Sequence, residues 1–194
     1  MHDFFKKELD WWLKEEEKGE VEVWFSDESS FHLNPNSMYG WQEKTLETLK
    51  KVFLPANRAR GANILGFMRT NNESEFYEFY QSMDADTFIA CVNNFIEKRA
   101  KGQKILLILD RATSHSNHKV DKAIKKWKEK NVFIQFLPSY CSDLNYIEML
   151  WKHIKHYWLD IAAWTNVKTL QKAVLDILAQ FGKEKEYTIN FAPS

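Results

Sequence analysis

The pattern of apolar and polar positions predicts strands in the first half of the chain and at two later places. Three stretches carry strand signatures, at residues 21–27, 63–69 and 74–80. The linker "TNNE" between the last two predicts a hairpin, and a short strand is expected near Trp41 after the turn-rich "LNPNSMYGW". The continuously apolar runs "KILLILD" and "VFIQFLP" predict two further strands, both buried, the first as a central strand of the sheet.

Elsewhere apolar residues recur every three or four positions, which predicts helices. The predicted helices span residues 3–17, from Asp84 or Asp86 to about 100, about 117–130, the stretch around 147–158, and 167–181. Strands come first, and helices and strands alternate afterwards. This order predicts a mixed sheet with helices packed on it, which is an α/β layered fold.

Composition narrows the class of protein. With 44% hydrophobic residues in 194, the chain can bury one globular core. The longest aliphatic run is far too short to cross a membrane, and the charged N-terminus does not resemble a signal peptide. Two cysteines without metal-type spacing favour a reduced cytoplasmic compartment. The 27 basic and 27 acidic residues give no net charge, so the whole chain is not a typical DNA-binding module.

Three acidic residues stand at or just after predicted strands. Asp27 ends the first predicted strand, Asp110 ends the continuously apolar strand, and Glu148 lies at the start of the helix after the last strand. Acidic residues in such places can form a site at the edge of a sheet. Clustered carboxylates repel one another unless a cation holds them, and their oxygens select Mg²⁺ or Mn²⁺. Two such metals would suit in-line phosphoryl transfer.

Spacing alone leaves two interpretations of Glu148 open. Asn145 could be the N-cap of the helix and Glu148 its third residue, a capping-box-like turn that stabilises by about 1 kcal/mol. Alternatively, Glu148 is a metal ligand. Lys152 and Lys155, four and seven positions later on the same helix face, would then meet the phosphates of a nucleic acid.

Three stretches resemble the signature blocks of a known family. They read "FSDESSFHLNP", "ILLILDRATSHSN" and "FLPSYCSDLNYIEMLWKHIK". They are similar to blocks of the DDE transposases, specifically the bacterial insertion-sequence branch of the mariner-like superfamily. The matching positions of the third block are Leu137, Pro138, Tyr140, Ser142, Leu144, Asn145, Ile147, Glu148 and Trp151.

The resemblance implies an RNase H-like fold, with a five-stranded mixed sheet flanked by helices. It also implies metal-dependent cleavage of DNA at transposon ends and joining of the 3′-hydroxyl to target DNA. Asp27, Asp110 and Glu148 match the catalytic acids and would hold a two-metal site of Mg²⁺ or Mn²⁺. The residues expected to contact double-stranded DNA are Lys152, Lys155 and Arg111.

Three positions depart from the family pattern, one of them the other usual Pro of the third block, which is replaced by Cys141 or Ser139. Arg111 follows the second acid where the family usually has Asn, and Tyr146 replaces the Pro before the Ile-Glu pair. Proline is favoured in the first turn of a helix, so its loss should weaken the start of this helix slightly. His115, in a polar loop, is interpreted as a surface or structural residue.

The resemblance also divides the chain into segments and suggests partners. We expect a linker helix at 1–19 packed on the domain, a catalytic domain at 20–182 and a loosely held tail at 183–194. The family's N-terminal helix-turn-helix module would be separate or missing, and a homodimer is compatible with the pattern. The domain would act on DNA in the cytoplasm, at the nucleoid. Two alternatives remain: another RNase H-like nuclease, or an inert domesticated domain that binds DNA or protein.

Overall fold

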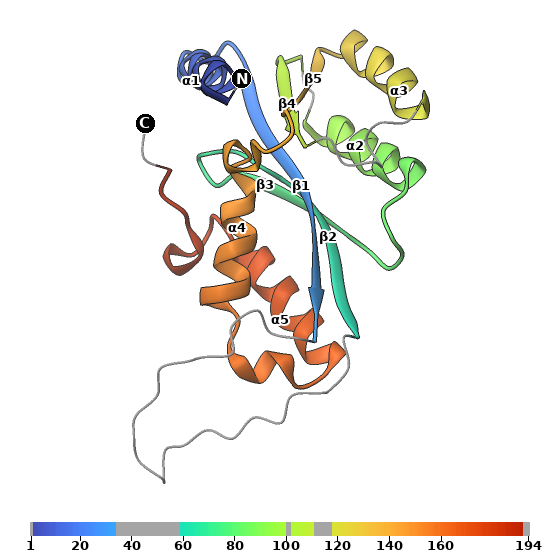
Figure 1. Ribbon diagram of the computed structural model, residues 1–194, viewed down its shortest axis with the longest axis vertical. Coiled ribbons are helices and arrows are strands. Elements are labelled where there is room, and N and C mark those ends of the chain that lie inside the picture. Colours follow the sequence, from blue (N-terminus) through green and yellow to red (C-terminus); the bar gives the residue numbers. More distant parts are fainter. Residues whose placement is uncertain (1, 34–58, 100–101, 111–117, 192–194) are drawn as a thin grey trace.

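The computed structural model describes residues 2–33, 59–99, 102–110 and 118–191 (Figure 1). Its strands are β1 (Glu22–His32), β2 (Arg60–Met68), β3 (Ser74–Phe79), β4 (Ile105–Leu109) and β5 (Val132–Phe136). They form one five-stranded sheet in the order β3-β2-β1-β4-β5. β2 runs antiparallel to β1 and β3, whereas β4 runs parallel to β1 and β5. The predicted mixed sheet is confirmed.

Helices cover both faces of this sheet (Figure 1). Their bounds are α1 (His2–Glu17), α2 (Ala85–Arg99), α3 (His118–Glu129), α4 (Ile147–His153) and α5 (Val167–Gln180). α1, α4 and α5 pack into one core, and α2 and α3 into the other. Side chains alternate along a strand, so Phe25 of β1 enters the first core and Trp24 enters the second. Every residue of β4 is buried because helices cover it on both faces.

Irregular helical turns surround α4. A 3₁₀ turn at Ser142–Leu144 precedes it, and a π-helical turn at Ile154–Trp158 continues it. A 3₁₀ turn at Ile161–Thr165 leads into α5, and another lies at Lys185–Tyr187.

Two strands differ from their prediction. β1 was expected to stop at Asp27 but continues to His32, because residues 25–32 pair with β2. β5 was expected to be buried, yet only Val132 of its five residues is, because β5 is an edge strand with a neighbour on one side. The strand expected near Trp41 lies outside the described residues.

Both ends of the described chain are attached to the domain. Glu16 of α1 accepts hydrogen bonds from the Val23 backbone N–H at 2.8 Å and from Arg69 Nε at 2.9 Å. Near the C-terminus Ile189 is buried, and its backbone N–H and carbonyl both bond to the side chain of Asn72. Ile189, which belongs to the tail expected at 183–194, is therefore attached to the turn between β2 and β3.

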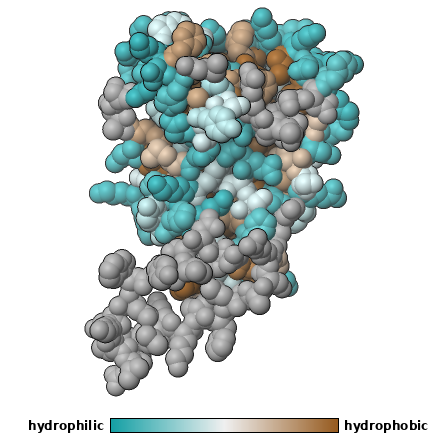
Figure 2. Space-filling model, in the orientation of Figure 1, coloured by the Kyte–Doolittle hydropathy of each residue, from teal (hydrophilic) through white to brown (hydrophobic). Residues whose placement is uncertain are grey.

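The face of the molecule shown in Figure 2 is mainly polar. In the view of Figure 2, hydrophilic residues make up most of the coloured surface, and hydrophobic residues form small separate areas. No helix in the described parts of the chain is long and apolar enough to cross a membrane. The large apolar residues of the sequence pattern lie mostly in the two cores.

Candidate active site

The parallel register of β1 and β4 brings Asp27 and Asp110 to neighbouring positions. Ser26 pairs with Leu109, the last residue of β4, and the two aspartates are the next residues along the chain. The residues two positions before each aspartate belong to the core under α4 and α5, so strand alternation directs both carboxyl groups to that face. The candidate site therefore lies where β4 ends and β1 continues beside it.

Gly66 lets α4 approach the sheet next to Asp27, its partner in the β1–β2 ladder. A Cβ atom at position 66 would lie 2.7 Å from Ile147 Cδ1 and 2.8 Å from the ring of Trp151. Both distances are well inside van der Waals contact, so a side chain here would push α4 away. This close packing fixes the helix that carries Glu148.

Gly66→Ala is therefore expected to lower the free energy of unfolding by about 1–3 kcal/mol, the usual cost of overpacking. The measurement is urea denaturation followed by tryptophan fluorescence. Adding Trp151→Leu to the same chain should make the added methyl group less costly, because it removes two of the three atoms closest to it. An unchanged denaturation midpoint for Gly66→Ala would mean that α4 does not depend on this contact.

The start of α4 is fastened to β1 by a buried amide. Asn145 is only 1% exposed, and its Nδ2 donates to the backbone carbonyl of Ser26 at 3.1 Å. The N-cap position is Tyr146, and no side-chain cap bond forms there. The capping-box interpretation is therefore wrong. The Oδ1 atom of Asn145, which would accept the cap bond, has no hydrogen-bond partner among the described residues, and the amide instead holds the helix to the sheet through Nδ2. Glu148 lies exposed in the first turn of α4.

The three acids act on one another electrostatically. Burial and the neighbouring charges raise the pKa of Asp27 to about 7. Loss of solvation is the largest cause and the charge of Asp110 the next; Glu148 adds to them, while the backbone N–H of Glu28 opposes them. The pKa of Glu148 is also raised, by partial loss of solvation and then by Asp110 and Asp143. The acids predicted from the sequence thus lie within electrostatic reach of each other.

The donor set fits a divalent cation, although the acids do not form a closed shell. Carboxylate oxygens suit Mg²⁺ and Mn²⁺, and a cation would offset the repulsion that raises the pKa of Asp27. Within the described ranges, no three His, Cys, Asp or Glu side chains already surround a point where a metal could sit. The structure therefore shows an acidic cluster that a cation would complete.

Lys155 brings a positive charge to this cluster from the π-helical turn that follows α4. Its Nζ lies 5.2 Å from the centroid of the Phe31 ring, and the residue is half-buried. Burial lowers the pKa of Lys155, whereas the charges of Asp27 and Glu148 raise it. Single π-helical turns are frequent at functional sites, and this one turns Lys155 towards the acids.

The other candidate nucleic-acid contacts are placed differently. Lys152 lies exposed on α4, and Lys155 is the lysine that acts on the pKa of Glu148. Arg111 and His115 lie outside the described residues. The structure therefore separates the two lysines that the sequence pattern placed on one face.

Tyr146 replaces the family's proline without leaving the start of α4 unsupported. Its φ is −61°, a value that proline also adopts. Its ring stacks on Phe25 at a centroid distance of 4.8 Å and on Phe191 at 5.4 Å. Aromatic packing therefore holds the position, which the sequence pattern did not predict.

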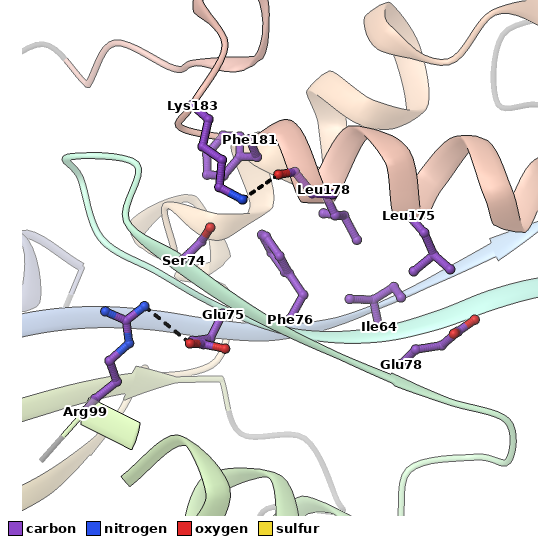
Figure 3. Close-up of a pocket in the computed structure, with 11 residues that line it drawn as sticks. Ile64, Ser74, Glu75, Phe76, Glu78, Arg99, Leu175, Leu178, Phe181 and Lys183 are labelled. Atoms are coloured by element: carbon purple, nitrogen blue, oxygen red, sulfur yellow. Dashed lines mark hydrogen bonds and ion pairs between the residues drawn. The ribbon is translucent and has the colours of Figure 1, made fainter. Parts of the chain in front are cut away.

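A separate hollow of about 500 Å³ lies between the edge strand β3 and α5 (Figure 3). Phe76, Ile64 and Leu178 point into it, and an ion pair between Arg99 and Glu75 borders it. The three acids do not line this hollow. It lies at another edge of the sheet and is not part of the candidate site.

Comparison with known proteins gives one family and several similar structures. The model of the family described as DDE superfamily endonuclease matches residues 22–171. The Mos1 strand transfer complex matches with a TM-score of 0.59 and 12% identity, over 96% of this chain and 54% of that one. The Mos1 transposase catalytic domain with Raltegravir and Mg matches with a TM-score of 0.52 and 12% identity, over 89% of this chain and 80% of that one. The catalytic core domain of BIV integrase matches with a TM-score of 0.52 and 13% identity, over 84% of this chain and 85% of that one.

At these identities the likeness establishes the fold, and the expected RNase H-like architecture is confirmed. The chain spans 54–57% of the length of the Mos1 transposase chains in two DNA complexes. No curated protein sequence gives a significant match. The family match covers β1 to the start of α5, and thus all three acids.

Proposed function

The chain belongs to the family of DDE superfamily endonucleases, and from that premise we propose that it is the catalytic domain of a transposase. The domain cleaves DNA strands at transposon ends and joins the 3′-hydroxyl to target DNA. The observation that carries the proposal is the register of β1 and β4, which sets Asp27 beside Asp110 with Glu148 in electrostatic reach.

Asp27, Asp110 and Glu148 are the residues that would hold Mg²⁺ or Mn²⁺. When bound, a pair of such cations supplies an activated attacking oxygen and charge stabilisation for the leaving oxygen. The chain itself supplies carboxylates on a rigid sheet, and Gly66 and Asn145 fix the helix that carries the third acid. Placing such groups before the reaction avoids reorganisation during it.

The proposed reaction is tested with supercoiled plasmid and Mn²⁺. We expect slow nicking with little sequence preference, since the described residues present no dedicated sequence-reading module. A short duplex with a free 3′-hydroxyl should also become joined to the plasmid. Joining separates a transposase from a simple nuclease, which would nick only. A protein that binds the plasmid but neither nicks nor joins would instead be an inert domesticated domain.

Lys155 is expected to contribute more to DNA binding than Lys152, because it alone is turned towards the acids. Lys155→Met keeps most of the apolar stem and removes the charge. The slope of the logarithm of the duplex binding constant against the logarithm of the salt concentration should therefore become less steep by about 0.9. Lys152→Met is the matched control and should change this slope less. Fluorescence anisotropy across a salt series measures both, and equal slopes for wild type and Lys155→Met would make Lys155 an ordinary surface lysine.

We further propose that recognition of the transposon ends resides in a helix-turn-helix module outside residues 20–182. The absence of net charge supports this, because sequence-specific DNA modules are usually basic. α1 would then be the connecting helix, and its packing through Glu16 is consistent with that role. A dimer would bring two such domains to two transposon ends, at the nucleoid where the DNA lies.

A further inference from the structure

The turn between β5 and α4 presents an aromatic ring to solvent in an uncommon backbone conformation. Tyr140 is 101% exposed, and its φ is +63°. Non-glycine residues seldom adopt this region because Cβ comes close to the following carbonyl oxygen. A singly exposed aromatic residue is ordinary by itself. The location of Tyr140 is what makes the combination informative.

Hydrogen bonds before and after the turn tie the segment that carries Tyr140 to the two strands that lead to the aspartates. Before the turn, the Leu137 N–H donates to the carbonyl of Leu109 at 2.7 Å. After it, Asn145 donates to the carbonyl of Ser26 at 3.1 Å. Leu109 and Ser26 directly precede the two aspartates on their strands. The turn therefore joins the two strands that carry the aspartates.

The turn is anchored in the core while its ring stays outside. Leu137, Cys141 and Leu144 are all buried, with 3–5% of each side chain exposed. Unfavourable backbone conformations persist where the surroundings over-determine them, and they concentrate at functional sites. The backbone at Tyr140 is thus held by its buried neighbours rather than left at the tip of a free loop.

We propose that Tyr140 is a positioning residue on which an unpaired base at the end of a DNA strand stacks. This inference rests on the proposed function and adds a contact for the substrate. Any nucleobase offers a π-face to an aromatic ring, so such a contact does not depend on sequence. It keeps the terminal nucleotide from moving while its phosphate lies at the acids. Tyr140 acts through the position of the DNA and not on the reacting atoms.

The test measures binding without catalysis. A short duplex carries 2-aminopurine as an unpaired terminal nucleotide, and binding is followed in EDTA at low salt. The wild-type protein is expected to quench the 2-aminopurine emission by stacking. Tyr140→Ala should remove the quenching and weaken binding about 5- to 150-fold, the range found for one stacked base. Tyr140→Phe should behave as the wild type because it keeps the ring.

Two further variants separate the ring from the backbone and from other exposed tyrosines. Tyr140→Gly adopts a positive φ without strain, so it should fold at least as well and yet lose the quenching. Tyr80→Ala removes an 80% exposed tyrosine beyond β3 and should leave binding unchanged. The proposal is overturned if the wild type does not quench, if Tyr140→Ala binds and quenches as the wild type does, or if Tyr140→Gly retains what Tyr140→Ala loses.

The outcome is distinguishable from failure of the proposed function. That function is tested by Mn²⁺-dependent nicking and joining, whereas stacking is measured without metal. If the wild type quenches the emission but does not nick DNA, the stacking proposal stands and the proposed enzymatic function is wrong. If Tyr140→Ala nicks DNA at the wild-type rate and quenches as the wild type does, the enzymatic function stands and the stacking proposal is wrong.

Discussion

Asp110→Asn is expected to reduce Mn²⁺-dependent nicking of plasmid DNA by a factor of about 10³ or more. The amide keeps the size and polarity of the side chain but removes the negative charge that would hold the cation. Metal coordination supplies several kcal/mol of transition-state stabilisation, and each 1.4 kcal/mol corresponds to a factor of ten. The rate is measured as the first-order loss of supercoiled plasmid at a fixed Mn²⁺ concentration.

Glu28→Gln provides the matched control for this prediction. Glu28 follows Asp27 on β1, and strand alternation directs its side chain to the opposite face of the sheet. This variant should nick DNA at nearly the wild-type rate. Circular dichroism and denaturation check that both variants fold. If folded Asp110→Asn keeps more than about a tenth of the wild-type rate, Asp110 is not a ligand of the reactive centre.

Asp27→Asn is expected to stabilise the metal-free protein at pH 8. The folded-state pKa of Asp27 is about 7, above the ordinary aspartate value near 3.9 in the unfolded chain. The folded protein therefore binds more protons than the unfolded chain between these values. The unfavourable charge is fully present above pH 7, and its effect declines as the pH falls towards 4. A pKa raised by about three units means that the charged carboxylate lowers the free energy of unfolding by at most about 4 kcal/mol. We therefore expect Asp27→Asn to raise the free energy of unfolding by about 2–4 kcal/mol at pH 8.

Urea denaturation in EDTA at pH 8, 6 and 4 measures this gain. The advantage of Asp27→Asn should shrink at pH 6 and nearly vanish at pH 4. Asp176→Asn is the control, because Asp176 is exposed and paired with Lys172 on the surface of α5. It should change stability by less than about 1 kcal/mol. A constant difference between Asp27→Asn and wild type at all three pH values would mean that Asp27 does not carry an unfavourable charge in the folded protein.

The sequence predicted the strands and helices best where one pattern acted over several residues. The run at 104–110 specified a strand covered on both faces, and the spacing of Phe88, Val92, Phe95 and Ile96 specified one face of α2; both are confirmed. Strand ends were less predictable. β1 continues past Asp27 because β2 supplies pairing partners, and pairing is a property of another part of the chain.

The helix carrying Glu148 shows why site geometry was harder to predict than site residues. Asn145 could cap a helix on local spacing, but its bond to Ser26 arises only when β1 lies beside it. Gly66 gave no sign of a role, since the clash it avoids involves residues 147 and 151. The π-helical turn that redirects Lys155 leaves no clear mark in the 3.6-residue pattern. These features depend on contacts between segments far apart in the sequence.

The most direct test of the account is Mn²⁺ binding by the isolated domain, measured by electron paramagnetic resonance without DNA. The cation is expected to lie among Asp27, Asp110 and Glu148. Wild type and Glu28→Gln should therefore bind Mn²⁺ with similar affinity. Asp27→Asn, Asp110→Asn and Glu148→Gln should each bind it at least about tenfold more weakly. Equal Mn²⁺ affinity in all five proteins would contradict the account.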